Sequence, residues 1–127
     1  MHSYSNFKSW AAYQKSYALA KQIFLISKNF PKEERYSLTD QIRRSSRSVC
    51  ANLAEAFAKR IYPKHFVAKI SDSAAENYET QTWLDFALDS AYLDQSMYSQ
   101  LTRQAEEVGK ILTYMQKNPS HYSHKQT

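Results

Sequence analysis

The chain has 127 residues and a formal net charge of +5 at pH 7, and it contains one glycine, three prolines and one cysteine. This length suits one domain with a single core, and so few glycines and prolines leave few turns, which favours a small number of long helices. The lone Cys50 excludes an internal disulfide, the apolar runs fall short of the ~20 residues of a membrane span, and the N-terminus does not resemble a signal peptide, so we expect a cytoplasmic protein.

The first two helices are predicted from apolar residues that recur every three or four positions, which is the spacing of an amphipathic helix. One runs from about residue 7 to 28 and ends before Pro31, because proline forces the preceding residue out of helical geometry. The next begins at Glu33 or Ser37 and ends near residue 60. The expected inward residues are Leu19, Ile23, Ile26 and Phe30, widened by Trp10, Tyr13, Tyr17 and Phe24, and then Leu38, Ile42, Ser45, Val49, Leu53 and Ala56.

The third helix is predicted to begin at Pro63, which suits a first helical turn, and to end near Asp94. The fourth runs from about Gln95 to Lys117 and is closed by Pro119. The expected inward residues are Phe66, Ile70, Ser73, Asn77, Leu84, Leu88 and Ala91, followed by Met97, Leu101, Val108, Ile111, Leu112 and Met115.

Together these elements predict an all-α fold, an antiparallel up-down-up-down four-helix bundle, because short connections between long helices favour antiparallel neighbours. A single domain would cover residues 1–119, and residues 120–127 would form a frayed polar tail. Among the many aromatic residues, Trp10, Tyr17 and Trp83 are expected to pack in the core.

Charge is distributed unevenly along the chain. Residues 1–35 carry six Lys/Arg and two Asp/Glu, and residues 36–70 carry seven and two. Residues 71–94 carry none and six, and residues 95–127 carry four and two. A basic first half and a purely acidic third segment predict either pairing inside the bundle or complementary surfaces between subunits.

The basic cluster of the second helix is Arg43, Arg44 and Arg47, on the side away from its apolar stripe. A hairpin turn near residue 61 or 62 would bring Arg44 level with Glu79 and Arg47 level with Glu76, so the cluster could form ion pairs within or between subunits. The alternative is phosphate binding, which suits guanidinium groups. A nucleic-acid surface on these helices would also include Lys8, Lys15, Lys21, Lys59 and Arg60.

An acidic row on the third helix, Asp72, Glu76 and Glu79, is the expected partner of those arginines. A metal site in a bundle would need Glu-x-x-His pairs from facing helices, and no Glu here has a His three residues on. We therefore expect no metal and no cofactor.

Two further stripes lie beside the core of the second helix. One is polar, and buried polar groups must be hydrogen-bonded, so it predicts a network that fixes the helix register or, alternatively, a small-ligand or anion site. Its residues, with two from the third helix, are Gln41, Ser48, Asn52, Glu55, Ser73 and Asn77. The other stripe consists of the small residues Cys50, Ala51, Ala54 and Ala58, which predict a subunit interface or a close contact inside the bundle.

The segment from Phe30 to Val49, FPKEERYSLTDQIRRSSRSV, followed by Asn-Leu-Ala-Glu-Ala at residues 52–56, carries a family resemblance. It is similar to the four-helix bundle proteins encoded in intervening sequences of bacterial 23S ribosomal RNA genes. The resemblance extends over about residues 7–117, with Ala51 and Ala56 in place of the family's proline and glycine. It implies a ring-like homopentamer without enzymatic activity. A related bundle, the accessory protein of diversity-generating retroelements, binds nucleic acid and a reverse transcriptase.

These observations predict a non-catalytic, homo-oligomeric interaction or scaffold protein, pentameric if it follows the family. The alternative is an accessory protein that binds RNA or DNA through the basic residues of the first two helices. No Gly-rich phosphate loop, metal-ligand spacing or Ser/His/Asp arrangement predicts an enzyme.

Overall fold

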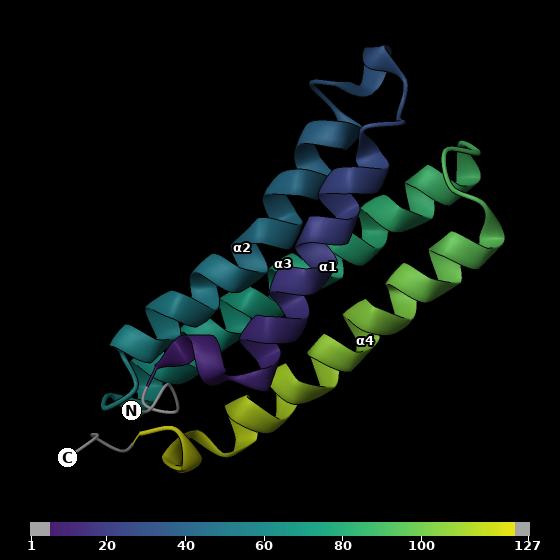
Figure 1. Ribbon diagram of the computed structural model, residues 1–127. Helices are drawn as coiled ribbons and strands as arrows, with labels where there is room; N and C mark the ends of the chain where they lie inside the picture. The colour runs from purple at the N-terminus through teal and green to yellow at the C-terminus, as the bar shows by residue number, and fades with distance from the viewer. Residues whose placement is uncertain (1–5, 124–127) are drawn as a thin grey trace.

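The computed structural model describes residues 6–123, and within that range the chain is helical, without a strand (Figure 1). The four long helices are α1 (Ala11–Ser27), α2 (Leu38–Ala58), α3 (Pro63–Asp89) and α4 (Gln95–Lys117). Three single-turn 3-10 helices accompany them, namely η2 (Phe7–Ser9), η3 (Lys32–Glu34) and η4 (Pro119–His121). The predicted all-α class is confirmed.

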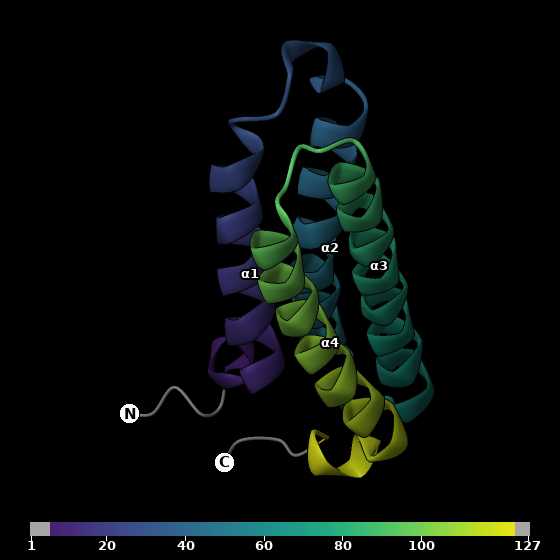
Figure 2. The same cartoon turned by 90° about the vertical axis from the view of Figure 1, so that its right-hand side faces the viewer.

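Successive helices run antiparallel and pack side by side as a bundle (Figures 1 and 2). Helix α2 packs against α1 and α3, and α4 packs against α1 and α3. Helices α1 and α3 lie diagonally across the bundle, so their backbones are not neighbours within residues 6–123, and their side chains meet only in the core. The up-down-up-down arrangement is therefore confirmed, and the two helices of most opposite charge are kept apart.

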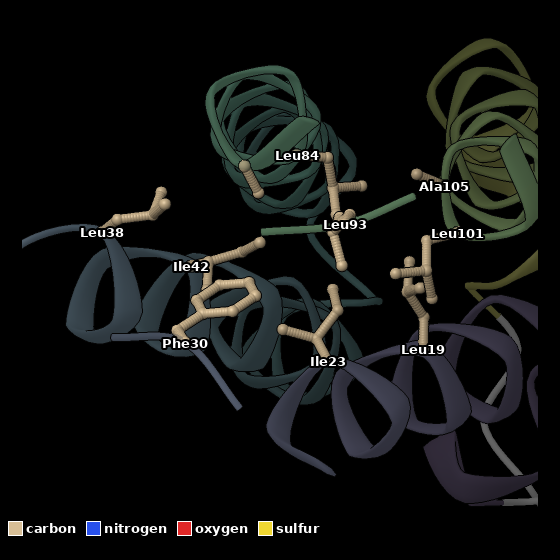
Figure 3. Close-up of a cluster of buried hydrophobic side chains, with 10 residues drawn as sticks. Leu19, Ile23, Phe30, Leu38, Ile42, Leu84, Leu93, Leu101 and Ala105 are labelled. Carbon is tan, nitrogen blue, oxygen red and sulfur yellow. The ribbon is translucent and has the colours of Figure 1, made fainter. Parts of the chain in front are cut away.

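The core consists of two apolar clusters, one toward each end of the bundle. In the cluster of Figure 3, Ile23 of α1 points toward Ile42 of α2 and Leu84 of α3, and Leu19 of α1 lies beside Leu101 of α4. The other cluster contains Leu53, Phe66, Ile70, Val108 and Leu112, all 2% exposed or less. Burial of each such side chain contributes about 1.5–3 kcal/mol relative to exposure, so these clusters are the main source of stability.

A buried polar layer separates the two clusters along the helices. Ser73 Oγ donates to the Val49 carbonyl at 2.8 Å, and Thr80 Oγ1 donates to Ser45 Oγ at 2.9 Å. Asn77 Nδ2 donates to the Ala105 carbonyl at 2.9 Å. These bonds tie α3 to α2 on one side and to α4 on the other, and they are made only in one register of the helices.

Two helix ends differ from the prediction. Helix α1 begins at Ala11 rather than near Phe7, because Trp10 is extended with a ψ of 134° and η2 forms a separate turn before it. Helix α3 ends at Asp89 rather than near Asp94, because Ala91 has a φ of 63° and lets the Tyr92 N–H donate to the Ala87 carbonyl at 2.8 Å.

Two of the expected inward residues are in fact exposed. Ala91 lies in the turn after α3 and is exposed, because its left-handed conformation has already ended the helix. Tyr17 is 51% exposed on α1 and does not pack in the core. On α2, in contrast, every expected inward residue is buried, which confirms the apolar stripe of this helix.

Part of the predicted tail packs on the bundle. The Tyr122 ring stacks on Phe66 with centroids 5.7 Å apart, and it meets Trp10 edge-on at 5.6 Å. Tyr122 therefore covers the end of the second apolar cluster. The remainder of the predicted tail, residues 124–127, lies outside the residues that the structure describes.

Candidate functional site

A groove of about 460 Å³ runs between α1 and α2 on the outside of the bundle. We call it the basic groove. Its lining comes from aromatic residues of α1 and small residues of α2, and its margins carry Lys21 and Arg47. The lining residues include Tyr13, Tyr17, Phe24, Cys50, Ala51 and Ala54. Three of the four residues of the small-residue stripe thus line the open groove, and Ala58 lies outside its lining.

Three cations surround the Phe24 ring at one end of this groove. The Arg43 and Arg47 guanidinium carbons lie 4.7 and 5.2 Å from the ring centroid, and Lys28 Nζ lies 4.9 Å from it. Arg43 is held further by Nε, which donates to Ser27 Oγ at 2.8 Å. Cation–π contacts hold charge in place without neutralising it, so these three cations keep their positive charge at this end of the groove.

The cations of the basic groove have no carboxylate close to them. Helix α1 contains no Asp or Glu. Within residues 6–123, no ion pair shorter than 4.0 Å involves Lys21, Lys28, Arg43 or Arg47. No carboxylate of the described chain therefore neutralises these cations by direct contact.

The predicted ion pairs Arg44–Glu79 and Arg47–Glu76 do not form in the single chain. Arg44 lies 3.9 Å from Asp40 on its own helix, and Arg47 turns toward Phe24. Successive helical positions are rotated by about 100°, so Arg43 and Arg47 share the α1 side of α2 while Arg44 faces α3. The arginine cluster is therefore divided between two sides of its helix.

The outer side of α3 is acidic and aromatic, and we call it the acidic ridge. It consists of Glu79, Asp85 and Asp89 together with Tyr78 and Phe86, whose side chains are 68% and 54% exposed. Between Ser71 and Asp89 the chain has no Lys or Arg. Two of the acids have neutral donors, because Glu79 accepts from Trp83 Nε1 at 3.1 Å and Asp85 accepts from the Tyr98 hydroxyl. The ridge keeps its negative charge.

Glu76 lies half-buried beside the ridge, on the side of α3 that faces α2. Burial raises its pKa first, and the neighbouring Glu79 and Asp72 raise it further, while Arg44 lowers it. The Arg44 charge therefore offsets only part of the effect of burial and of the neighbouring acids on Glu76. The predicted acidic row is thus only partly paired, since of its three members Asp72 alone forms an ion pair in the described part of the chain.

A second group of polar residues lies on the surface between α2 and α3, centred on Lys69. Lys69 Nζ lies 2.7 Å from Glu55 and 3.6 Å from Asp72, and it donates to Asn52 Oδ1 at 3.4 Å. The hydrogen bond to Glu55 and the charge of that carboxylate raise the pKa of Lys69. The sequence interpretation missed Lys69, although a turn near residue 62 that aligns Arg44 with Glu79 also aligns Glu55 with Lys69.

The residues of the predicted polar network do not form one network but fall into separate groups. Ser73 and Asn77 belong to the buried layer, whereas Asn52 and Glu55 belong to the Lys69 group at the surface. Ser48 contributes its carbonyl, which accepts from Asn52 Nδ2 at 2.9 Å. Gln41 stands apart from both groups and lines a hollow of about 810 Å³ between the start of α2 and the acidic ridge.

Lys59 and Arg60 lie far from Arg43, Arg44 and Arg47, at the end of the bundle where Phe7, next to Lys8, packs on Phe57. Twelve residues separate Arg47 from Lys59, or about 18 Å along a helix. Arg60 packs its guanidinium 4.0 Å from the Phe57 ring centroid and donates to the Phe57 carbonyl. The five predicted contact residues therefore do not form one continuous patch.

No group of three His, Cys, Asp or Glu side chains within residues 6–123 could hold a metal ion. Cys50 is buried, its Sγ lies 3.3 Å from Ser16 Oγ, and burial raises the pKa of its thiol, which disfavours the nucleophilic thiolate. None of the described helices is long and apolar enough to cross a membrane.

Known proteins share this fold and part of this sequence. The family model described as 23S rRNA-intervening sequence protein matches residues 8–114. Among solved structures, the chain is similar to a protein of unknown function from the S23 ribosomal protein family of Bacteroides thetaiotaomicron VPI-5482, at 26% identity and a TM-score of 0.76. That match covers 84% of this chain and 95% of the other. No curated protein matches.

Proposed function

The chain belongs to the 23S rRNA-intervening sequence protein family, and from this premise we propose that it is a non-catalytic interaction protein that assembles with copies of itself. The observation that carries the proposal is a pair of oppositely charged surfaces on different sides of the bundle, the basic groove between α1 and α2 and the acidic ridge on the outer side of α3. Each surface combines uncompensated charge with exposed rings or methyl groups. Such surfaces suit association, because burial of the apolar part stabilises and the charges select the partner.

A ring is the assembly that we propose, with five copies as the family resemblance implies. Contacts between two different surfaces of identical subunits are head-to-tail, and they close into rings when the rotation between neighbours allows. The buried lone Cys50 thiol suits a reducing compartment, and we propose the cytoplasm as its location.

Light scattering on the purified full chain at micromolar concentration tests self-assembly. We expect a mass close to five times that of one chain. A monomer under these conditions would overturn the proposal.

A second candidate function is RNA or DNA binding, and the cations around Phe24 favour it. Arg43, Arg47 and Lys28 hold three positive charges beside an aromatic ring without a carboxylate within ion-pair distance. Phosphate binding would supply that counter-charge, and the affinity would fall steeply with salt as counterions are released.

A mobility-shift assay at about 50 mM salt tests this second function. We expect Arg43→Ala/Arg47→Ala to weaken binding and Lys59→Ala, at the other end of α2, to leave it nearly unchanged. Equal affinity of the first variant and the wild type would exclude the groove as a nucleic-acid site. No binding by the wild type would exclude the function as a whole.

A further inference from the structure

We propose that the acidic ridge of one copy occupies the basic groove of the next copy. This inference rests on the proposed self-assembly and adds to it the two surfaces that meet. The occupant is a second copy because the same chain carries both halves of a complementary pair. In each copy, helix α1 has no carboxylate and helix α3 has no cation after Lys69.

The charges of the two surfaces complement each other. Lys21 and Arg47 line the groove, Lys28 and Arg43 lie against Phe24 at its end, and Glu79, Asp85 and Asp89 lie along the ridge. None of these seven side chains belongs to an ion pair within residues 6–123. Docking would therefore form new ion pairs without breaking existing ones.

The apolar parts of the surfaces also match. The groove floor is made of Ala51 and Ala54, with Tyr17 exposed at its side, so it offers space and hydrocarbon. The ridge presents Tyr78 and Phe86, two large rings that remain more than half exposed in the single chain. Aromatic residues that fill a pocket lined by small side chains are typical anchors of protein interfaces. A hydrated phosphate backbone would fit the cations but would leave this apolar lining unused.

The position of the surfaces makes the contact head-to-tail. Helices α1 and α3 lie on opposite sides of the bundle (Figure 2), so one chain cannot place its own ridge in its own groove. Each copy therefore offers one groove to one neighbour and one ridge to another. This geometry propagates around a ring, whereas a two-fold dimer would use the same patch of both copies.

Charge reversal on each surface tests the proposed contact. A groove variant, Lys21→Glu/Arg47→Glu, and a ridge variant, Glu79→Lys/Asp89→Lys, should each shift light-scattering mass to the monomer at concentrations at which the wild type is assembled. Lys59→Glu/Lys64→Glu is the matched control for the groove variant, because it makes the same change in net charge at two exposed residues near the start of α3. It should remain assembled. Circular dichroism checks that every variant is folded.

Combining the substitutions in one chain, or mixing the two variant proteins, distinguishes a head-to-tail contact from other arrangements. A single chain with all four reversals should regain assembly in part, because the two new carboxylates of the groove can then pair with the two new lysines of the ridge. An equal mixture of the groove and ridge variants should also associate, but only with alternating neighbours. A closed ring of five cannot alternate, so the mixture should form even-numbered or open assemblies.

A second pair of substitutions tests the anchors without a change of charge. Tyr78→Ser/Phe86→Ser removes two exposed rings and should weaken assembly by at least tenfold in dissociation constant while the fold is retained.

If the wild type assembles but neither charge reversal nor loss of the rings changes its assembly, the inferred contact is wrong and self-assembly stands. If the groove variant stays assembled and loses only RNA binding, the groove belongs to nucleic acid. A monomeric wild type would overturn both proposals.

Discussion

Asn77 shows how one buried amide can specify the packing of α3 against α4. Its side chain is 2% exposed, and its Nδ2 donates to the Ala105 carbonyl. Asn77→Asp would keep the shape of the side chain and replace this donor by a carboxylate oxygen that faces a carbonyl. We expect a loss of about 3 kcal/mol or more in unfolding free energy at pH 7, because the charge is buried without a partner. The loss should shrink at acid pH as the carboxyl becomes protonated.

Asn52→Asp is the matched control for this substitution. Asn52 is half-buried and lies beside Lys69, so a carboxylate there would gain a cation that offsets the lost donation from Nδ2 to the Ser48 carbonyl. Its effect should stay within about 0.5 kcal/mol in urea denaturation. Equal effects at the two positions would show that the buried layer does not depend on the Asn77 donor.

Glu34 links the start of α2 to the turn between α3 and α4. Its carboxylate accepts from the Ser37 hydroxyl at 2.6 Å, from the Leu38 N–H at 3.2 Å and from the Tyr92 hydroxyl at 2.8 Å. The hydrogen bond from Ser37 lowers its pKa most, followed by those from Tyr92 and Leu38. The charged Glu34 carboxylate therefore stabilises the folded state fully at pH values above its ordinary pKa of 4.5. This stabilisation is lost as the pH falls through the lower pKa of Glu34 in the folded state.

Glu34→Ala should accordingly lower the unfolding free energy by about 1 kcal/mol at pH 7. Denaturation of both proteins across pH 7 to 3 measures the difference, which should narrow toward pH 3. A difference that is unchanged over this range would show that the charged form of Glu34 is not what stabilises the link.

At the scale of the elements, the end of α3 depends on an unusual alanine. Ala91 closes the helix with a φ of 63°, in the left-handed region that costs a residue with a Cβ about 1–2 kcal/mol. Because Ala91 is exposed, replacing it with glycine should lose no packing and raise the unfolding free energy by about 1 kcal/mol. Thermal denaturation measures the gain.

Ala68→Gly is the control for this substitution, because it introduces glycine inside helix α3 and should lower the stability. Ala68 is exposed within the helical part of α3, where glycine costs about 0.5–1 kcal/mol relative to alanine. The two substitutions should therefore shift the melting temperature in opposite directions. Destabilisation at both positions would mean that Ala91 is not strained.

The sequence predicted the helices well because their apolar residues recur with helical spacing. The stripe from Leu38 to Ala56 is buried at every predicted position, since it faces both α1 and α3. The ends were harder to place. Neither proline nor glycine marks the turn at Ala91, and the break at Trp10 depends on the extended backbone of a residue with no turn preference of its own.

The candidate site was predictable in part for a similar reason. Charge asymmetry indicated complementary surfaces, and the small residues of α2 indicated an open contact. The partners of individual arginines depend on the rotation of α2 between its neighbours, which the spacing of Arg43, Arg44 and Arg47 does not fix alone. Tyr17 could not be assigned to the surface because its spacing also fits the edge of the apolar stripe.

At the scale of the whole molecule, the bundle separates its charges instead of pairing them. Only four ion pairs occur in the described residues, and the side chains of most of their members are more than 40% exposed. Such pairs contribute about 0–1 kcal/mol each, so the charge pattern contributes little to the fold. We propose that its role is to direct how copies meet.

The most direct measurement of that role is crosslinking with a zero-length carbodiimide, which joins a lysine amine to a carboxylate in contact with it. A mixture of isotopically labelled and unlabelled full-length copies distinguishes links between chains from links within one. We predict mixed-isotope crosslinks that join Lys21 or Lys28 to Glu79 or Asp89. An assembled sample in which neither lysine is linked to α3 of another copy would contradict the account.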